Sequence, residues 1–166
     1  MATLRFLLNG VACSEHDAPP GMTVLDYLRT VRRLTGTKEG CAEGDCGACT
    51  IAFKRLRSDR YEAVNSCLML LPQLDGASVL TVEGLARPDG ALHPVQQALL
   101  DTDGTQCGFC TPGFVMAMFA FQQGGEIPTN ENIHEALAGN LCRCTGYRPI
   151  VDACRKIAGE SANAVD

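Results

Sequence analysis

The sequence predicts an α+β fold in which a small sheet domain precedes an all-helical bundle. Short alternating runs with a hairpin turn fill the first half, and apolar residues recur at helical spacing in the second. A turn-rich link, Arg87-Pro88-Asp89-Gly90, separates the two. We therefore expect one domain at 1–85, a second at 86–160, and a tail or linker at 161–166.

The first half is expected to hold five strands and one helix. Asn9-Gly10 tolerates positive φ at both positions and predicts a hairpin. Thr23 is a candidate N-cap for a helix that reaches Arg33, with Leu25 and Leu28 on its apolar face. The expected strands cover 3–8, 11–15, 50–56, 61–66 and 78–84.

The second half is expected to form four short helices, which is typical of a small bundle. The expected helices cover 93–100, 111–122, 129–138 and 149–158. Pro94, Pro112 and Pro149 fit first-turn positions, and Thr129 is a candidate N-cap. The second helix is apolar on nearly every face, so we expect it either in the bundle core or against another chain.

Composition and charge restrict the class of partner. The formal net charge of -5 does not suggest a nucleic-acid partner. No apolar run approaches the roughly 20 residues of a membrane helix, so we expect no membrane partner. The N-terminal MATLRFLLNG is broken by Asn9-Gly10 and is not typical of a signal peptide, which favours a cytoplasmic location.

Ten cysteines are many for 166 residues. They suit either five disulfides in a secreted protein or metal ligands in a cytosolic one, and the close spacings favour ligands. The CxxC spacings also occur in thioredoxin-like redox sites. Neither CxxC lies in the strand–helix setting that such a site requires.

The segment CAEGDCGACT carries the stronger of two cysteine patterns. Cys41, Cys46 and Cys49 form C-x4-C-x2-C, and Cys67 follows at the end of an expected strand. This is the plant-type ferredoxin spacing for one [2Fe–2S] cluster. Glycines between the cysteines let backbone N–H groups point at sulfur. A structural zinc site is the weaker alternative, because zinc loops usually use paired cysteines.

The helical half holds a second pattern, Cys107-Gly-Phe-Cys110 with Cys142-Arg-Cys144. Each pair precedes an expected helix, so two helix N-termini can face one anionic centre. A zinc clasp across the two helices remains open from spacing alone. Cys13 and Cys154 are isolated and are expected to be small buried side chains.

Four segments together resemble the iron–sulfur region of the xanthine dehydrogenase and aldehyde oxidase family. They are TGTKEGCAEGDCGACT, VNSCLMLLPQ, LHPVQQALLDTDGTQCGFCTPGFVMAM and AGNLCRCTGYRPIV, and the resemblance runs over about 3–158. The pair QCGFCTPG and GNLCRCTGY is specific to this family. The segments GTKEGC-EGDCGACT and CLMLLPQ resemble the sequences of the bacterial xanthine dehydrogenases most.

The resemblance implies a β-grasp, plant-type ferredoxin-like domain followed by a four-helix bundle with its own [2Fe–2S] cluster. It implies ligands Cys41, Cys46, Cys49 and Cys67 for the first cluster, and Cys107, Cys110, Cys142 and Cys144 for the second. Gln106 would hydrogen-bond the pterin of a molybdenum cofactor, and Cys144 would approach the same pterin. Electrons would pass from molybdenum through the second cluster and then the first to FAD.

The partners implied are a large subunit with the molybdenum-pterin cofactor and an FAD-binding subunit or domain. The chain itself lacks a Gly-rich dinucleotide motif and is expected to be an electron relay without catalytic residues of its own. Purine oxidation of the xanthine dehydrogenase type is the expected reaction of the complex. Oxidation of an aldehyde or another N-heterocycle is the alternative reaction. Two further hypotheses do not involve a molybdenum hydroxylase: a free ferredoxin and a zinc-binding interaction module.

Five other positions are candidates for smaller roles. His93 is expected to cap a helix rather than bind metal. Lys38 with Glu39 either sets the potential of the first cluster, faces the flavin partner or is a solvated pair. Arg143 and Arg148 flank the second set of cysteines and would either offset the cluster's negative charge or contact the pterin pyrophosphate, of which the second is the weaker hypothesis.

Overall fold

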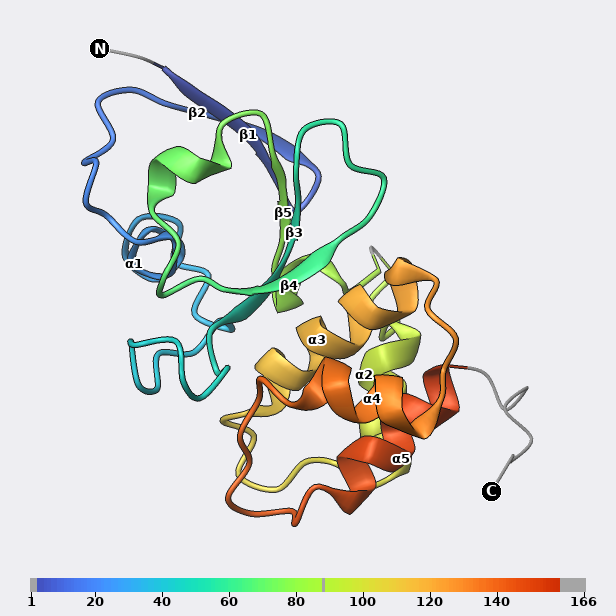
Figure 1. Cartoon of the computed structure of the whole chain (residues 1–166). Coiled ribbons are helices and arrows are strands. Elements are labelled where there is room, and N and C mark those ends of the chain that lie inside the picture. Colours follow the sequence, from blue (N-terminus) through green and yellow to red (C-terminus); the bar gives the residue numbers. More distant parts are fainter. Residues whose placement is uncertain (1–2, 88, 159–166) are drawn as a thin grey trace.

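The computed structural model describes residues 3–87 and 89–158, and it confirms the α+β class. A five-stranded sheet forms the upper unit in Figure 1, and four helices form the lower one. The strand order is β2-β1-β5-β3-β4, with β1 parallel to β5 and the other neighbours antiparallel. This mixed sheet with a helix on one face is the arrangement expected for the β-grasp.

The sheet follows the predicted alternation closely. β1 (Leu4–Leu8) buries every second side chain, and β2 (Val11–Glu15) returns beside it. Asn9 and Gly10 both have positive φ, so the predicted hairpin is confirmed. The other strands are β3 (Thr50–Lys54), β4 (Glu62–Asn65) and β5 (Ser78–Leu80).

Two predictions for the first half are wrong in detail. The expected helix of 23–33 is one α-helical turn, α1 (Val24–Asp26), followed by a π-helical turn, η1 (Tyr27–Val31). Thr23 does cap it, accepting a hydrogen bond from the Asp26 N–H at 3.0 Å. The expected strand of 78–84 stops at Leu80, and a 3₁₀ turn, η3 (Val82–Gly84), follows.

The side chain of Asn9 explains the early end of β5. Its Oδ1 accepts a hydrogen bond from the Thr81 N–H at 2.8 Å, so this buried donor bonds to a side chain instead of a strand. A further 3₁₀ turn, η2 (Leu71–Leu74), was not predicted and contributes Leu71 and Leu74 to the sheet core.

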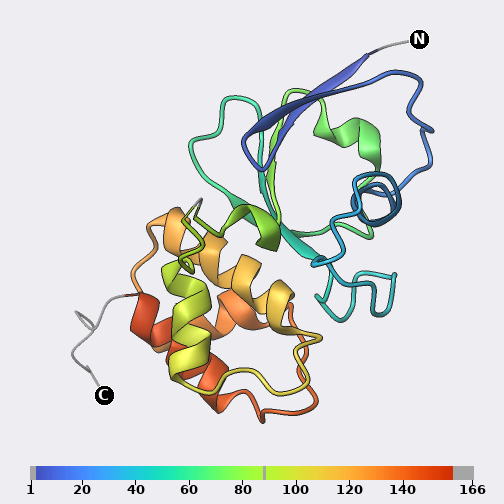
Figure 2. The same cartoon turned by 180° about the vertical axis from the view of Figure 1, so that it is seen from behind.

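The helical half contains α2 (Pro94–Asp101), α3 (Thr111–Gly124), α4 (Asn130–Leu137) and α5 (Arg148–Ile157). α3 lies in the middle, with the sheet on one side and the other helices on the other (Figures 1 and 2). Residues 113–121 of α3 are all buried within the chain. The apolar helix is therefore bundle core, and the alternative of a contact with another chain is not needed.

The two units share part of one core. Ala52 of β3 belongs to the same apolar cluster as α3, and the Tyr61 ring packs edge-on against Phe119 at 5.6 Å. The His93 ring packs on Phe119 from the helical side at 5.5 Å. His93 also caps α2, as predicted, by accepting a hydrogen bond from the Val95 N–H. Cys13 and Cys154 are buried, as expected.

Candidate metal centres

The first four cysteines come together where β3 and β4 pair. Cys49 directly precedes β3, and Cys67 follows β4 by two residues. The register that pairs Thr50 with Asn65 brings these two cysteines side by side. Between them, the Ser66 hydroxyl donates to the Cys49 carbonyl at 2.7 Å. Cys41 and Cys46 lie in the preceding loop.

The loop turns its backbone donors toward the Cys41 sulfur. The N–H groups of Glu43, Asp45 and Cys46 lie 3.5, 3.3 and 3.3 Å from Sγ. These donors, with that of Glu43 foremost, lower the pKa of the Cys41 thiol to about 7. Gly40 lies against the same site, because a Cβ there would sit 2.7 Å from the Cys46 sulfur. The donor set therefore suits a thiolate ligand.

Cys49 and Cys67 form the buried side of this site. Burial, and then the adjacent Cys49 thiol, raise the pKa of Cys67 to about 11. Two neighbouring buried thiols cannot both ionise unless a cation compensates their charge. A metal would supply that charge and deprotonate the coordinating thiols outright.

The second four cysteines lie before α3 and α5. Cys110 is the N-cap residue of α3, and Cys107 lies three residues earlier. The loop before α5 carries Cys142 and Cys144. All four line a hollow of about 420 Å³, together with Phe109, Leu141, Arg143 and Tyr147. The predicted set is therefore brought together around one space.

The thiols of this second set pair two by two. Burial, and then the hydrogen-bonded Cys142 thiol, raise the pKa of Cys110 to about 12. Hydrogen bonding to the Cys107 thiol raises the pKa of Cys144 in the same way. Burial opposes ionisation of Cys142, but the Thr145 hydroxyl at 3.1 Å and the Thr145 N–H at 3.5 Å hold its pKa below the ordinary value.

Over the described ranges, no three Cys, His, Asp or Glu side chains are arranged to hold a single metal ion. Each set instead offers two pairs of thiols, which is the donor arrangement of a cluster with two irons and two cysteines on each. In the first set the pairs are Cys41 with Cys46 and Cys49 with Cys67. The residues present therefore fit a [2Fe–2S] group better than a lone ion.

The two sets are joined directly. The Leu141 N–H, beside Cys142, donates to the Cys46 carbonyl at 3.0 Å. Phe109 lies between the sets, since its ring edge is 3.6 Å from where a Gly40 Cβ would be. Figures 1 and 2 show the loops around 41–49, 102–110 and 138–147 next to one another on the same side of the molecule.

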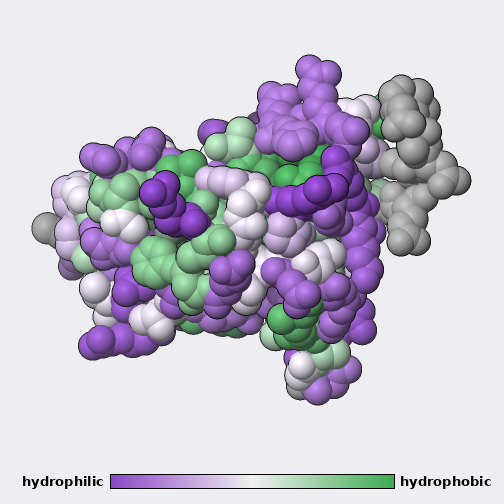
Figure 3. Space-filling view, turned by 90° about the horizontal axis from the view of Figure 1, so that it is seen from below, coloured by the Kyte–Doolittle hydropathy of each residue, from purple (hydrophilic) through white to green (hydrophobic). Residues whose placement is uncertain are grey.

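The structure also places the predicted partner-facing residues. Gln106 and Cys144 are both exposed at the rim of the second set. Exposed apolar side chains lie next to the cysteine loops. They are Leu68, Phe109, Leu141 and Tyr147. The face seen from below shows apolar patches among hydrophilic residues (Figure 3).

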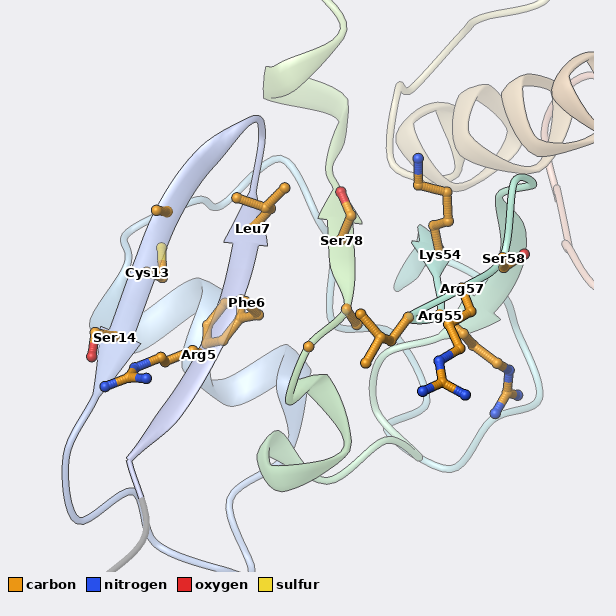
Figure 4. Close-up of a pocket in the computed structure, with 14 residues that line it drawn as sticks. Arg5, Phe6, Leu7, Cys13, Ser14, Lys54, Arg55, Arg57, Ser58 and Ser78 are labelled. Atoms are coloured by element: carbon orange, nitrogen blue, oxygen red, sulfur yellow. The ribbon is translucent and has the colours of Figure 1, made fainter.

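A separate groove of about 520 Å³ crosses the sheet at the opposite end of β3 from Cys49 (Figure 4). It is rimmed by Arg5, Lys54, Arg55 and Arg57. Lys54 lies over the Tyr61 ring and points away from Arg55, which pairs with Glu62 at 3.7 Å. The cations do not converge as an anion site requires.

Sequence reasoning missed three residues that support these sites. Thr145 bonds the Cys142 sulfur, and the Tyr147 hydroxyl accepts a hydrogen bond from the Cys142 N–H at 3.0 Å. Asn140 links the two sets through its side-chain amide. All three lie in the GNLCRCTGY motif, but no local pattern distinguishes their side-chain contacts.

Two known domain families match this chain. The family described as "2Fe-2S iron-sulfur cluster binding domain" matches residues 6–71, and the "[2Fe-2S] binding domain" family matches residues 81–155. The fold and these matches define an iron–sulfur protein with two [2Fe–2S]-binding domains.

Curated relatives include oxidoreductases of two kinds. The chain is 48% identical over 156 residues to aldehyde oxidase 1 of Rattus norvegicus. It is 49% identical over 156 residues to xanthine dehydrogenase 1 of Arabidopsis thaliana. These matches cover 92% and 91% of this chain but 12% and 11% of the relatives, so the chain spans only a small part of their length.

Solved structures agree with this assignment. A chain of quinoline 2-oxidoreductase from Pseudomonas putida 86 matches with 36% identity and a TM-score of 0.83, covering 95% of this chain and 93% of that one. The aldehyde oxidoreductase of Desulfovibrio desulfuricans matches with 37% identity and a TM-score of 0.84, with 17% of that chain covered. The chain belongs to the iron–sulfur components of the molybdenum hydroxylase family, and its role is electron transfer.

Within the part of the chain that the structure describes, every helix is too short or too polar to cross a membrane.

Proposed function

We propose that the chain relays electrons through two [2Fe–2S] clusters held by the eight cysteines. Cys41, Cys46, Cys49 and Cys67 would hold one, and Cys107, Cys110, Cys142 and Cys144 the other. The observation that carries this proposal is the direct hydrogen bond from the Leu141 N–H to the Cys46 carbonyl. It connects a neighbour of one ligand set to a member of the other, so the two clusters would lie close together.

The proposed direction of electron flow comes from the family resemblance, and the exposure of the two cysteine loops suits it. Cys144 and Gln106 are exposed, which suits contact with a molybdenum-pterin cofactor on a large partner subunit. The Cys41 loop is the other open edge and suits an FAD-binding subunit or domain. The proposed route runs from molybdenum through the helical cluster and then the ferredoxin-like cluster to FAD. Coverage of 93% of the quinoline 2-oxidoreductase chain supports a separate iron–sulfur subunit.

The proposed reaction of the whole complex is xanthine oxidation, in the cytoplasm, with the bacterial xanthine dehydrogenases as the nearest type. Relatives named xanthine dehydrogenase support it. Relatives named aldehyde oxidase, and the quinoline enzyme, support the alternative of an aldehyde or another N-heterocycle as substrate. In the proposed arrangement the molybdenum-binding partner holds the substrate, so residues of that partner choose between these reactions.

Single cysteine substitutions test the ligand sets. Cys49→Ser should remove the first cluster and Cys110→Ser the second, because each loses one of its four thiolates. Electron paramagnetic resonance of the reduced complex should lose one of two signals in each case. Cys13→Ala is the matched control, a buried cysteine outside both sets, and should keep both signals. Loss of both signals from either ligand variant would contradict the separate sets.

Anaerobic reduction by substrate tests the reaction. The native complex should bleach in the visible range when xanthine is added without air, because purine electrons would reach the clusters. Bleaching by dithionite but not by xanthine would contradict the purine assignment and leave the relay intact. Aldehydes and N-heterocycles would then be tried in the same assay. Metal analysis should give about four irons per chain.

A further inference from the structure

Asn140 lies buried between the two cysteine sets, with 5% of its surface exposed. Its Nδ2 donates to the Gly47 carbonyl at 2.9 Å and lies 3.1 Å from the Thr50 hydroxyl. Gly47 sits between Cys46 and Cys49, and Asn140 lies two residues before Cys142. A side chain from the helical unit thus bonds the backbone of the first cysteine loop.

The Gly47 carbonyl accepts hydrogen bonds from both units. The Thr50 N–H and hydroxyl donate to it at 3.0 and 2.7 Å from the sheet side, and Asn140 donates from the helical side. The backbones approach so closely here that a Cβ on Gly47 would collide with the Gly139 carbonyl. A Cβ on Gly113, at the start of α3, would collide with the Gly47 carbonyl. A side chain at position 47 or 113 therefore does not fit between these backbones.

Two adjacent bonds then join the loops. Asn140 bonds Gly47, and the next residue, Leu141, bonds Cys46 through its N–H. The Asn140 backbone is itself anchored, because its N–H donates to the Leu137 carbonyl at the end of α4. The Asn140 amide therefore holds Leu141 in register with Cys46, which a single backbone bond between two loops would not do alone.

We propose that Asn140 is a positioning residue that fixes the separation and orientation of the two clusters. This inference rests on the proposed ligand sets. Loss of the amide removes one hydrogen bond to the Gly47 carbonyl and one to the Thr50 hydroxyl. The Gly47 carbonyl then keeps only its donors from the sheet side, and the helical loop loses its side-chain bond to the Cys46 loop. The helical loop then shifts relative to the Cys46 loop, and the clusters shift with it. Neither ligand set loses a thiol.

Asn140→Ala tests this in the native, dithionite-reduced complex. The readout is the splitting that two nearby reduced clusters impose on each other's paramagnetic resonance lines, which depends steeply on their distance. We expect both clusters to be retained, with unchanged iron content, and the splitting to shrink. Asn132→Ala is the matched control. That side-chain amide also donates to a backbone carbonyl, at 2.8 Å, but at the far end of α4, and its removal should leave the splitting unchanged.

An unchanged splitting in Asn140→Ala with both clusters present would overturn the positioning role while leaving the ligand sets intact. Absence of two cluster signals from the unsubstituted complex would instead contradict the proposed function. If Asn140→Ala does not retain its clusters, Asn140→Leu serves in its place. Leucine fills the space of the side chain but has no N–H to donate to the Gly47 carbonyl, so the splitting shrinks there too, and an unchanged splitting overturns the proposal.

Discussion

Gly47 meets two constraints at one position. Its φ of +67° is costly for any residue with a Cβ, and its Cα faces the Gly139 carbonyl at close approach. Gly125, at the end of α3, has nearly the same φ of +68° but open space around it. A comparison of alanine substitutions at Gly47 and Gly125 therefore separates two contributions to the free energy of unfolding. One is the strain of a left-handed backbone, which both positions have, and the other is the collision between the two cysteine loops, which only Gly47 has.

Gly47→Ala should destabilise the protein more than Gly125→Ala does. Both variants place alanine in the left-handed region, at about 1–2 kcal/mol. Only Gly47→Ala adds a backbone collision, which typically costs about 1–3 kcal/mol more. The difference in unfolding midpoints, measured in denaturant, checks it. Equal losses in the two variants would show that the loops separate without cost.

At the residue scale, the sequence predicts which side chains bind metal or cap a helix better than it predicts which distant residues they contact. The cysteine spacings predict two sets of four thiols, and the structure brings the members of each set near one another. That each set binds a cluster stays a prediction. His93 and Thr129 are recognisable as caps from their neighbours, and both cap their helices. Asn140 is not recognisable, because its acceptor Gly47 lies 93 positions away and no local periodicity links them.

At the scale of helices and strands, sequence patterns predict an element correctly where interactions between neighbouring residues determine it. The Asn9-Gly10 turn and the strand alternation give the hairpin its type and register. Such patterns predict an element's end wrongly where a residue far away in the sequence forms a hydrogen bond there. Asn9 also ends β5, since its side chain takes the Thr81 N–H from 72 residues away. The π-helical turn after α1 has the same apolar spacing as an α-helix over so few residues, so periodicity cannot separate them.

The N-cap of α2 should make stability depend on pH. Burial, aided by Arg87, lowers the pKa of His93, and its Nδ1 must be unprotonated to accept the Val95 N–H. The unfolded chain therefore binds a proton at higher pH than the folded chain does. Stability from this group is full above the unfolded pKa of about 6.5 and is lost as pH falls below it.

Unfolding midpoints of the intact protein at about pH 7.5 and about pH 5.5 check this, on either side of the unfolded histidine pKa. His93→Asn keeps a capping side chain that does not titrate, so its midpoint should fall less than that of the unsubstituted protein. His134→Asn is the control, because His134 is exposed. An equal fall in His93→Asn and the unsubstituted protein would contradict the cap.

At the scale of the whole molecule, the exposed apolar side chains around the cysteine loops form the surface that a partner would cover. Leu141 and Leu100 are equally open, at 49% and 53% exposure, but only Leu141 adjoins the cysteines. Its backbone N–H bonds Cys46 whatever its side chain is. The two leucines therefore form a matched pair for testing where the proposed molybdenum-binding chain docks.

Leu141→Ser should weaken binding of the large subunit, and Leu100→Ser should not. Burying a leucine side chain is worth about 1.5–3 kcal/mol, which corresponds to about 10- to 100-fold in dissociation constant. Titration of the large subunit onto each variant, with iron content measured in parallel, checks it. Equal affinities for both variants would place the docking surface elsewhere.

The burial of α3 against β3 and β4 has a consequence for the link between the two halves. That link is exposed at Ala86, Arg87 and 89–92. The two halves are joined independently of it, because the Tyr61 and His93 rings both pack against Phe119 of α3. A chain cut in the link by a protease would therefore stay together as a noncovalent pair of fragments. Once the molecule has folded, the two halves no longer need the peptide link to stay associated. In a chimera that takes its two halves from different relatives, the buried face of α3 would have to fit the β3 and β4 side chains of the other half.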